Sequence, residues 1–196
     1  MPMTALGVGI VGCGTISGIY MQNISRFPGL RLVACADIRE DAARAAAEKY
    51  GADARSLDAL LASPDIDIVV NLTVPVAHFA VSHAALTAGK HVFSEKPLCT
   101  ESEHGRALVA EASRRGVRLG CAPDTFLGAG IQTVKAAMTE IGTPAIVQVR
   151  MLAQPPEAWH PSPAFLYAEL AGPLLDIGPY GVATAVELVG PVTRVT

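Results

Sequence analysis

The sequence contains no apolar run that approaches the ~18 residues of a membrane-spanning helix, and no segment with a signal-peptide layout precedes its first apolar strand. It also lacks runs of like charge, because 15 basic and 18 acidic residues are interspersed and give a net charge of −3. Proteins that bind nucleic acid or anionic membrane surfaces concentrate basic charge. We therefore expect no nucleic-acid partner and no membrane association, and we expect a cytoplasmic location.

The chain has no Cys-x-x-Cys pair and no histidines at the spacing of metal ligands. Its four cysteines and five histidines are scattered, so we expect no metal site. We interpret the cysteines as small core residues of a protein from a reducing compartment. They are Cys13, Cys35, Cys99 and Cys121. What the chain does contain is hydrophobic residues, at 51% of the sequence, which is ample for a buried core.

Short apolar strands alternate with helical segments through the first part of the chain. The expected strands are Leu6–Gly12, Leu30–Ala36, Ile66–Thr73, His91–Ser94 and Val117–Cys121. The expected helices are Thr15–Phe27, Glu40–Tyr50, Leu57–Ala62, Val76–Ala88, and one that opens on a capping-box pattern at 100–103 and ends at Gly116. This alternation predicts an α/β fold with a doubly wound parallel sheet. The strands are apolar throughout, as expected of a sheet covered on both faces.

The pattern changes at Pro123, so we expect a dinucleotide-binding domain over 1–122 and a different unit over 123–196. The second unit is expected to hold two helices, one strand, an irregular proline-rich loop and the beginning of another strand. These are helices Leu127–Met138 and Leu175–Leu188, the latter interrupted near Gly178, strand Ala145–Leu152, loop 154–163 and strand start 193–195. Because these elements do not close a second core, we interpret 123–196 as the front part of a larger α/β domain.

The first strand runs into the motif GCGTIS at 12–17, which departs from Gly-x-Gly-x-x-Gly only at its last position. A tight turn explains Gly12, and a close approach of the backbone to a pyrophosphate explains Gly14. The N–H groups of Thr15 and Ile16 would then meet phosphate oxygens at a helix N-terminus. The alternative is an ordinary strand–helix turn, but the preceding strand and the alternating pattern favour a dinucleotide site.

Asp37 closes the second strand, at about the 20-residue spacing from the motif that is typical of a ribose-binding acidic residue. Such a carboxylate binds the adenosine ribose hydroxyls and repels a 2′-phosphate, which favours NAD. The neighbouring Ile38 and Arg39 are assigned to the same site, and Arg39 keeps NADP possible. The alternative is a helix N-cap, since 37–40 has capping-box form.

Thr73 ends the expected third strand, and Pro75 and His78 follow it; all three are further candidates for cofactor binding. Pro75 also suits a helix start on structural grounds alone. His78 is expected in the first turn of the next helix, near the ligand crevice at the carboxyl ends of the strands. A solvated or capping histidine is the alternative reading of His78.

Glu95, Lys96 and Pro97 stand at the carboxyl end of the fourth strand, beside the expected crevice. Lys96 is a candidate acid/base, and a cis bond before Pro97 would hold it in one direction. The alternative is a solvated surface turn. A second pair of chemical candidates, Asp176 and Tyr180, is four residues apart, so one helix would place both on one face. Asp176 alternatively caps the following helix.

Taken together, these motifs resemble the Gfo/Idh/MocA family of NAD(P)-dependent oxidoreductases, above all in AGKHVFSEKP at 88–97 and in GPLLDIGPY at 172–180. The resemblance implies a Rossmann domain followed by a substrate domain that often forms an oligomer interface, and so a possible homo-oligomer. It further implies that Lys96 assists proton transfer at a substrate hydroxyl and also borders the cofactor, as does Glu95. Asp176 would be the active-site aspartate. Tyr180 stands where the family usually has a catalytic histidine.

The resulting hypothesis is an oxidoreductase that transfers a hydride between NAD, or NADP, and a secondary hydroxyl or carbonyl of a small-molecule substrate. A sugar, polyol or related compound is expected as that substrate. Two alternatives stay open: a cofactor-binding module without a working substrate site, and an interaction protein that associates with a longer homologue. Tyr180 in place of histidine, and the short second unit, favour the first of these alternatives.

Overall fold

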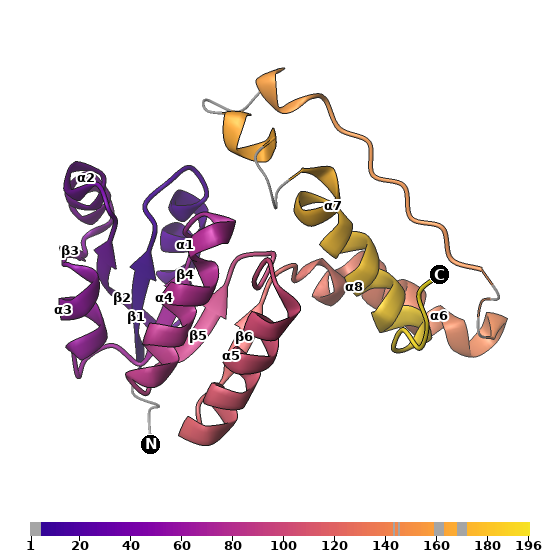
Figure 1. The fold of residues 1–196 in the computed structure, drawn as a ribbon, viewed down its shortest axis with the longest axis horizontal. Coiled ribbons are helices and arrows are strands. Elements are labelled where there is room, and N and C mark those ends of the chain that lie inside the picture. Colours follow the sequence, from indigo (N-terminus) through magenta and orange to yellow (C-terminus); the bar gives the residue numbers. More distant parts are fainter. Residues whose placement is uncertain (1–4, 143, 145, 159–162, 168–171) are drawn as a thin grey trace. The chain divides into compact units, whose positions relative to one another are not determined.

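The computed structural model describes residues 5–142, 144, 146–158, 163–167 and 172–196. The chain divides into two compact units, Met1–Ala122 and Pro123–Thr196, which are described separately. Figure 1 shows the course of the chain from the amino terminus to the carboxyl terminus.

Unit 1 is built on a parallel six-stranded sheet in the order β3-β2-β1-β4-β5-β6. Its strands are β1 Leu6–Val11, β2 Leu30–Ala36, β3 Asp53–Ala54, β4 Ile68–Asn71, β5 His91–Ser94 and β6 Leu119–Cys121. The predicted doubly wound sheet is therefore confirmed. The sequence did not predict β3, whose two residues are both exposed and carry no hydrophobic pattern.

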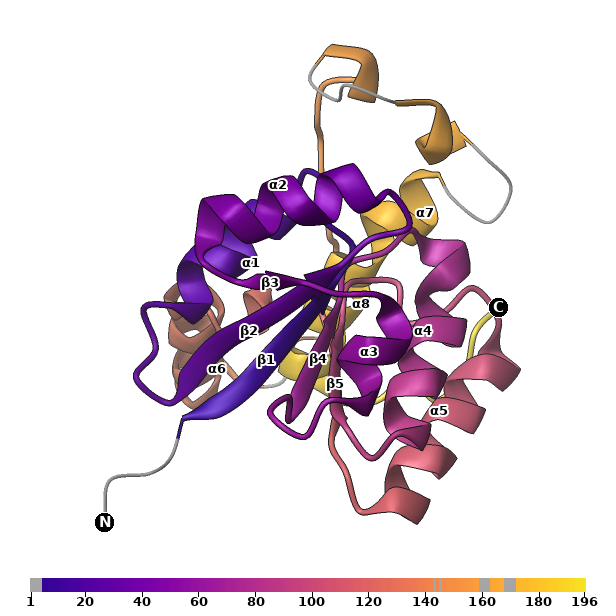
Figure 2. The same cartoon turned by 90° about the vertical axis from the view of Figure 1, so that its left-hand side faces the viewer.

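Helices cover both faces of this sheet (Figures 1 and 2). They are α1 Ser17–Ile24, α2 Glu40–Tyr50, α3 Leu57–Ala62, α4 Pro75–Thr87 and α5 Ser102–Arg115. On one face, Met21 of α1 and Ala47 of α2 pack against Ile10 and Val70 of the sheet. Residues of α3, α4 and α5 pack on the other face. They include Leu60, Leu86 and Leu108, each with no exposed surface. Full burial of one such side chain contributes about 1.5–3 kcal/mol.

The helix ends follow local backbone chemistry. Gly51 and Gly116 end α2 and α5 in the left-handed conformation, at φ 69° in each case. Pro75 stands in the first turn of α4, where a missing N–H costs nothing. The predicted capping box at 100–103 is wrong, because the residue before α5 is Glu101 and no side chain caps that helix. Helix position is set here by packing of Leu108 and Ala112 rather than by the cap.

The strand order has a topological switch point between β1 and β4. The chain passes from β1 outward to β2 and β3, and then returns to pair β4 on the other side of β1. Loops therefore leave the carboxyl ends of β1 and β4 in opposite directions. In open parallel sheets, ligands bind at this switch point.

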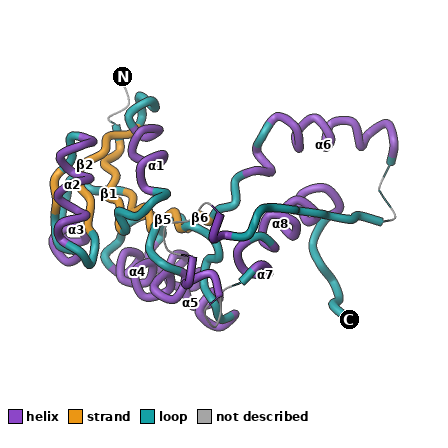
Figure 3. The backbone as a smooth tube through the Cα atoms, turned by 90° about the horizontal axis from the view of Figure 1, so that it is seen from above, coloured by secondary structure: helices purple, strands orange, loops and turns teal. Residues whose placement is uncertain are grey.

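The regular secondary structure of unit 2 is helical within its described residues. It holds α6 Ala129–Ile141, α7 Pro173–Asp176 and α8 Gly178–Val189, with short 3-10 turns at Thr125–Leu127, Pro156–Ala158 and Pro163–Tyr167. An ion pair joins Lys135 of α6 to Glu187 of α8. Figure 3 shows the helices in purple and the loops between them in teal.

The predicted strand Ala145–Leu152 is wrong, because residues 146–152 form no ladder within the part of the chain that the structure describes. An alternating pattern gives a strand only where a neighbouring strand accepts its hydrogen bonds. Without such a partner, Ile146 is 79% exposed and Leu152 is 96% exposed. Residues 193–195 likewise form no strand. Ala145 and residues 159–162 of the predicted loop lie outside the described residues.

The expected interruption in the last helix is found at Ile177, between α7 and α8. Asp176 ends α7, whereas Tyr180 lies in the first turn of α8, so one continuous helix does not hold both. The alternative role of Asp176 as the cap of α8 is wrong, because Ile177 precedes α8 and no side chain caps it.

Candidate cofactor-binding site

The glycine-rich turn has one glycine that the protein itself requires. Gly12 has φ +99°, and a Cβ there would lie 2.6 Å from the carbonyl carbon and oxygen of Leu72. Any other residue would strain the turn and push β1 away from β4. Gly12 therefore lets the ends of these two strands approach each other.

The second glycine of the turn has no such internal reason. A Cβ on Gly14 would meet no protein atom within 4 Å, and its φ lies outside the left-handed range. A glycine that the fold does not need is what a close backbone approach to a pyrophosphate requires. Next to it, Ser17 is 4% exposed and its hydroxyl donates to the Gly14 carbonyl at 2.7 Å. A small residue at this position packs the helix against the sheet, and the turn thus fits a dinucleotide.

Thr15 and Ile16 lie exposed between the turn and the start of α1. No side chain caps α1. The first N–H groups of a helix have no partner within the helix and carry partial positive charge. The N-terminus of α1 therefore presents N–H groups that can donate hydrogen bonds to phosphate oxygens.

The Asp37 carboxylate supports the same turn. Its Oδ2 accepts from the Cys13 N–H at 2.7 Å, and its Oδ1 accepts from the Arg39 N–H at 2.8 Å. A carboxylate offers about four acceptor positions, so each oxygen keeps one for a ribose hydroxyl. The capping-box alternative is wrong, because Arg39 is the residue before α2 and no side chain caps that helix.

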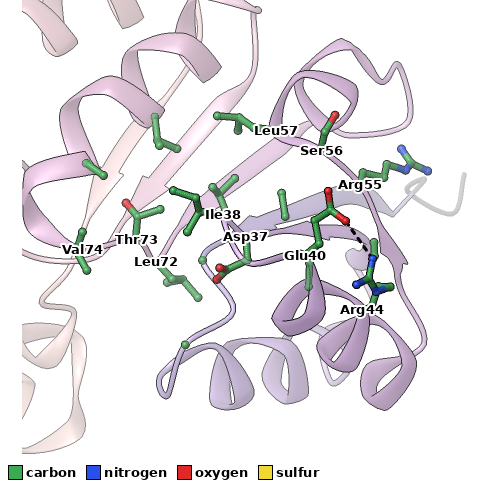
Figure 4. A pocket seen from close by; sticks show the side chains of 18 residues that line it. Asp37, Ile38, Glu40, Arg44, Arg55, Ser56, Leu57, Leu72, Thr73 and Val74 are labelled. Atoms are coloured by element: carbon green, nitrogen blue, oxygen red, sulfur yellow. Dashed lines mark hydrogen bonds and ion pairs between the residues drawn. The ribbon is translucent and has the colours of Figure 1, made fainter. Parts of the chain in front are cut away.

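A cavity of about 840 Å³ opens at the carboxyl ends of β1, β2 and β4 (Figure 4). Ligand cavities typically measure about 300–1,000 Å³ and are mostly apolar. Five of the predicted cofactor-binding residues line it, namely Gly12, Gly14, Asp37, Ile38 and Thr73. Lining residues that the sequence did not single out include Leu72, Val74, Ala77, Val81, Ser56 and Leu57. Figure 4 shows Asp37 and Thr73, from different strand ends, bordering this common space.

Both arginines of the cavity wall are paired with carboxylates. Arg44 contacts Glu40 at 3.1 Å. The Arg55 guanidinium contacts Asp53 at 2.8 Å and Asp65 at 3.3 Å, and these bonds raise its pKa. The Ser63 hydroxyl and Arg55 together lower the pKa of Asp65 to about 2. The positive charges of both arginines are therefore compensated by neighbouring carboxylates. A 2′-phosphate in this cavity would meet these paired arginines and the Asp37 carboxylate.

A buried polar network lies under the β4–α4 loop. Asn71 has no exposed surface, and its Oδ1 accepts from the Thr73 hydroxyl at 2.7 Å. Its Nδ2 donates to the His78 carbonyl at 3.0 Å and to the Ser82 hydroxyl at 2.9 Å. Sequence reasoning missed Asn71 and Ser82. An asparagine that ends an otherwise apolar strand was the available signal.

The His78 ring belongs to this network and is only 1% exposed. Its Nδ1 lies 2.6 Å from the Pro97 carbonyl oxygen, and its Nε2 lies 2.9 Å from the Thr73 carbonyl oxygen. The solvated alternative for this histidine is therefore wrong. His78 does not line the cavity described above.

The Glu95–Pro97 segment is held from two sides. The Tyr20 hydroxyl of α1 donates to Glu95 Oε1 at 2.7 Å, and the Lys96 N–H donates to Glu95 Oε2 at 3.0 Å. The Lys96–Pro97 peptide bond is cis, and both residues are half-buried. Tyr20 was not predicted, because nothing in the sequence links α1 to the end of β5.

The remaining predicted residues are placed as follows. Thr15, Ile16, Arg39, Pro75, Glu95 and Lys96 come after the carboxyl ends of β1, β2, β4 and β5 but do not line the cavity, and Asp176 and Tyr180 belong to unit 2. All four cysteines are free, and only Cys35 is fully buried. Burial and the Glu95 charge raise the pKa of the Cys121 thiol to about 12, so it is no nucleophile at neutral pH.

The described part of the chain lacks both clusters of potential metal ligands and helices able to span a membrane. No group of three His, Cys, Asp or Glu residues there could hold a metal ion. None of the helices in those residues has the length and apolar character needed to cross a bilayer.

Comparisons with known proteins agree with the geometry. A family model described as an oxidoreductase family with an NAD-binding Rossmann fold matches residues 6–122. The chain is similar to an inositol 2-dehydrogenase from Rhizobium meliloti, at 36% identity over 57% of this chain and 34% of that protein. It is also similar to dTDP-3,4-didehydro-2,6-dideoxy-alpha-D-glucose 3-reductase from Streptomyces violaceoruber, at 34% identity over 97% of this chain and 56% of that protein.

Among solved structures, the WlbA dehydrogenase from Bordetella pertussis, in complex with NADH and UDP-GlcNAcA, matches with a TM-score of 0.85. The identity is 28%, and the match covers 98% of this chain and 57% of that one. The chain thus spans only 34% and 56% of the length of the two relatives above.

Proposed function

The chain belongs to the Gfo/Idh/MocA family of oxidoreductases, and from this premise we propose that it serves reversible hydride transfer between NAD and a secondary hydroxyl of a sugar, polyol or sugar nucleotide. The observation that carries the proposal is the cavity at the switch point of the sheet. In this mostly apolar cavity, the Asp37 carboxylate lies with the turn at Gly14, where no protein atom occupies the space beside the backbone. The relatives named as an inositol dehydrogenase and a sugar-nucleotide reductase support the substrate class.

The residues of unit 1 would hold the dinucleotide by three kinds of contact. The backbone from Gly14 to Ile16 donates to the pyrophosphate, and the free acceptor positions of Asp37 bind the adenosine ribose. Ile38 is fully exposed beside the cavity and covers the adenine side. Arg39, Thr73, Pro75 and Glu95 border the cofactor from the surrounding loops. When bound, the nicotinamide ring accepts or donates the hydride.

Lys96 is proposed to handle the proton. Its ammonium group polarises or protonates the substrate oxygen, and its neutral amine removes the hydroxyl proton in the oxidising direction. We propose that Asp176 and Tyr180 assist substrate binding and proton movement. A tyrosine hydroxyl can donate or relay a proton in place of the family's histidine. Residues 123–196 are accordingly proposed to be part of a substrate domain, with homo-oligomer formation through this domain as a further proposal.

The first experiment measures cofactor binding, by titrating the protein with NADH and with NADPH and recording nicotinamide fluorescence. We expect saturable binding, tighter for NADH. Sugars, polyols and sugar nucleotides are then screened as substrates, and turnover is measured as a change in nicotinamide absorbance. Turnover of one class supports the proposed reaction. Binding of NADH without turnover of any compound supports the alternative of a cofactor-binding module, and absence of NADH binding contradicts the proposal as a whole.

A further inference from the structure

His78 joins two main-chain carbonyls beneath the surface of unit 1. Its imidazole nitrogens lie 2.6 Å from the Pro97 oxygen and 2.9 Å from the Thr73 oxygen. Carbonyl oxygens only accept, so a ring nitrogen bonds to them when it carries a hydrogen. A neutral ring can satisfy one of these carbonyls, and a doubly protonated ring can satisfy both. In either form, the ring lies between two loops that are distant in sequence, and it donates to one of them or to both.

The two loops follow neighbouring strands at the same edge of the sheet. β4 and β5 are paired, with Asn71 opposite Ser94 at their carboxyl ends. Thr73 follows β4 and lines the cofactor cavity. Pro97 follows β5 and comes directly after Lys96. His78 thus links a cavity residue to the residue next to the proposed acid/base.

The surroundings of His78 fix its main chain in turn. Its own carbonyl accepts from Asn71 Nδ2 at 3.0 Å, and the same amide donates to Ser82 at 2.9 Å. Asn71 Oδ1 accepts from Thr73, so the amide is engaged on both sides. A buried hydrogen-bonded network of this kind favours a single geometry, because rearrangement leaves further polar groups without a partner.

We propose that His78 is a positioning residue, which holds Lys96 in register with the cofactor-binding loop at Thr73 and touches neither cofactor nor substrate itself. This inference rests on the proposed function and replaces direct cofactor contact as the role of His78. Loss of the ring removes the hydrogen-bond donor from at least one of these two part-buried carbonyls. The loop that carries Lys96 then samples several conformations.

The experiment compares His78→Gln with the matched control His83→Gln. His83 lies on the same helix α4 and is half-buried, but its ring lies beside Phe79, with centroids 5.6 Å apart. Lysines are reductively methylated with ¹³C-formaldehyde, which preserves their charge, and are followed by NMR. Lys96→Arg assigns the Lys96 signal among those of Lys49, Lys90 and Lys135.

In wild type and in His83→Gln, Lys96 is expected to give one sharp signal that shifts when NADH is added. In His78→Gln the signal is broadened or split and loses that shift, whereas NADH affinity stays within several-fold of wild type. A purely structural role would change the unfolding temperature and leave the Lys96 signal of the folded protein unmoved. An unchanged Lys96 signal in His78→Gln overturns the proposal.

Failure of the proposed function is distinguishable from failure of this inference. If wild type does not bind NADH, the proposed function fails, and the Lys96 signals of the unliganded proteins still decide the positioning role. If His78→Gln does not fold, wild type labelled with ¹⁵N-histidine provides the test. Slow exchange of a His78 ring N–H with solvent supports the carbonyl bridge, and fast exchange at both nitrogens overturns it.

Discussion

The backbone N–H of Cys13 donates to the Asp37 carboxylate at 2.7 Å and so joins the glycine-rich turn to the end of the neighbouring strand. One carboxylate therefore supports the turn that we propose binds the pyrophosphate, and it keeps acceptor positions for the proposed bonds to the adenosine ribose. Loss of Asp37 is expected to affect both ends of the adenosine diphosphate at once. The same charge opposes a 2′-phosphate, which links the shape of the turn to the choice of cofactor.

Asp37→Ala is expected to weaken NADH binding by about ten- to a hundredfold, because hydrogen bonds to a charged group contribute about 1.5–3 kcal/mol. NADPH binding should fall less, or improve, since the charge clash is removed. Fluorescence titration of both cofactors measures the two affinities. Asp41→Ala is the control, because it removes the same charge from the exposed side of α2. Equal NADH and NADPH affinities in wild type would contradict the role of Asp37.

Lys96→Met is expected to lower turnover by about 10²–10⁴, the usual contribution of a general acid/base. Affinity for NADH should remain within several-fold, because the cavity residues are untouched. Initial rates with a substrate found in the screen provide the measurement. Lys49→Met, which changes an exposed lysine of α2, should leave the rate unchanged. Near-normal turnover in Lys96→Met would remove Lys96 from the reaction.

Leu108→Ala is expected to destabilise unit 1 by about 2–5 kcal/mol, since it opens a cavity at a fully buried position. Val109 is the matched control, because it is the next residue of α5 and is 56% exposed. Val109→Ala should cost less than about 1 kcal/mol, as surface substitutions usually do. Chemical denaturation of both variants reports the difference, and similar midpoints would show that α5 is not packed as described.

Hydrogen exchange is expected to divide the chain at the boundary of the two units. Amides of β1 and β4 are paired in the centre of the sheet and should be strongly protected. Residues 146–152 form no ladder in the described structure, and their amides should exchange at nearly the rate of an unstructured peptide. Mass spectrometry of peptic fragments resolves the two regions. Uniform strong protection through Thr196 would show that unit 2 is more stable than its exposed surface suggests.

The first unit was largely predictable because a parallel sheet covered on both faces needs continuous apolar strands. β5 occupies the predicted residues His91–Ser94, and β1 loses only Gly12 from its predicted end. The two-residue β3 was missed, since it is too short to show a pattern. In unit 2, the alternation at 145–152 predicted a strand that is not formed, because strand formation depends on a partner that the segment itself does not encode.

The residues of the candidate site were predictable where they belong to a local motif of recognisable spacing. Gly12, Gly14 and Asp37 are recognisable from type and spacing, and the structure brings all three to one cavity. Side chains that act through tertiary contacts were not recognisable. Tyr20 reaches Glu95 only because α1 folds over the sheet, and the bond of His78 to Pro97 requires β4 and β5 to be paired. The local sequence around each of these residues does not indicate such long-range contacts.

The central place of β1 also sets an order of events during synthesis. The ribosome releases β1 and β2 first, but the second neighbour of β1 is β4, which begins only at Ile68. Until that segment emerges, one edge of the first strand stays open to other chains. The dinucleotide cavity cannot close earlier either, because Leu72 to Val81 form one of its walls. A nascent chain therefore gains the second partner strand of β1 and the last wall of the cavity in the same stretch of translation.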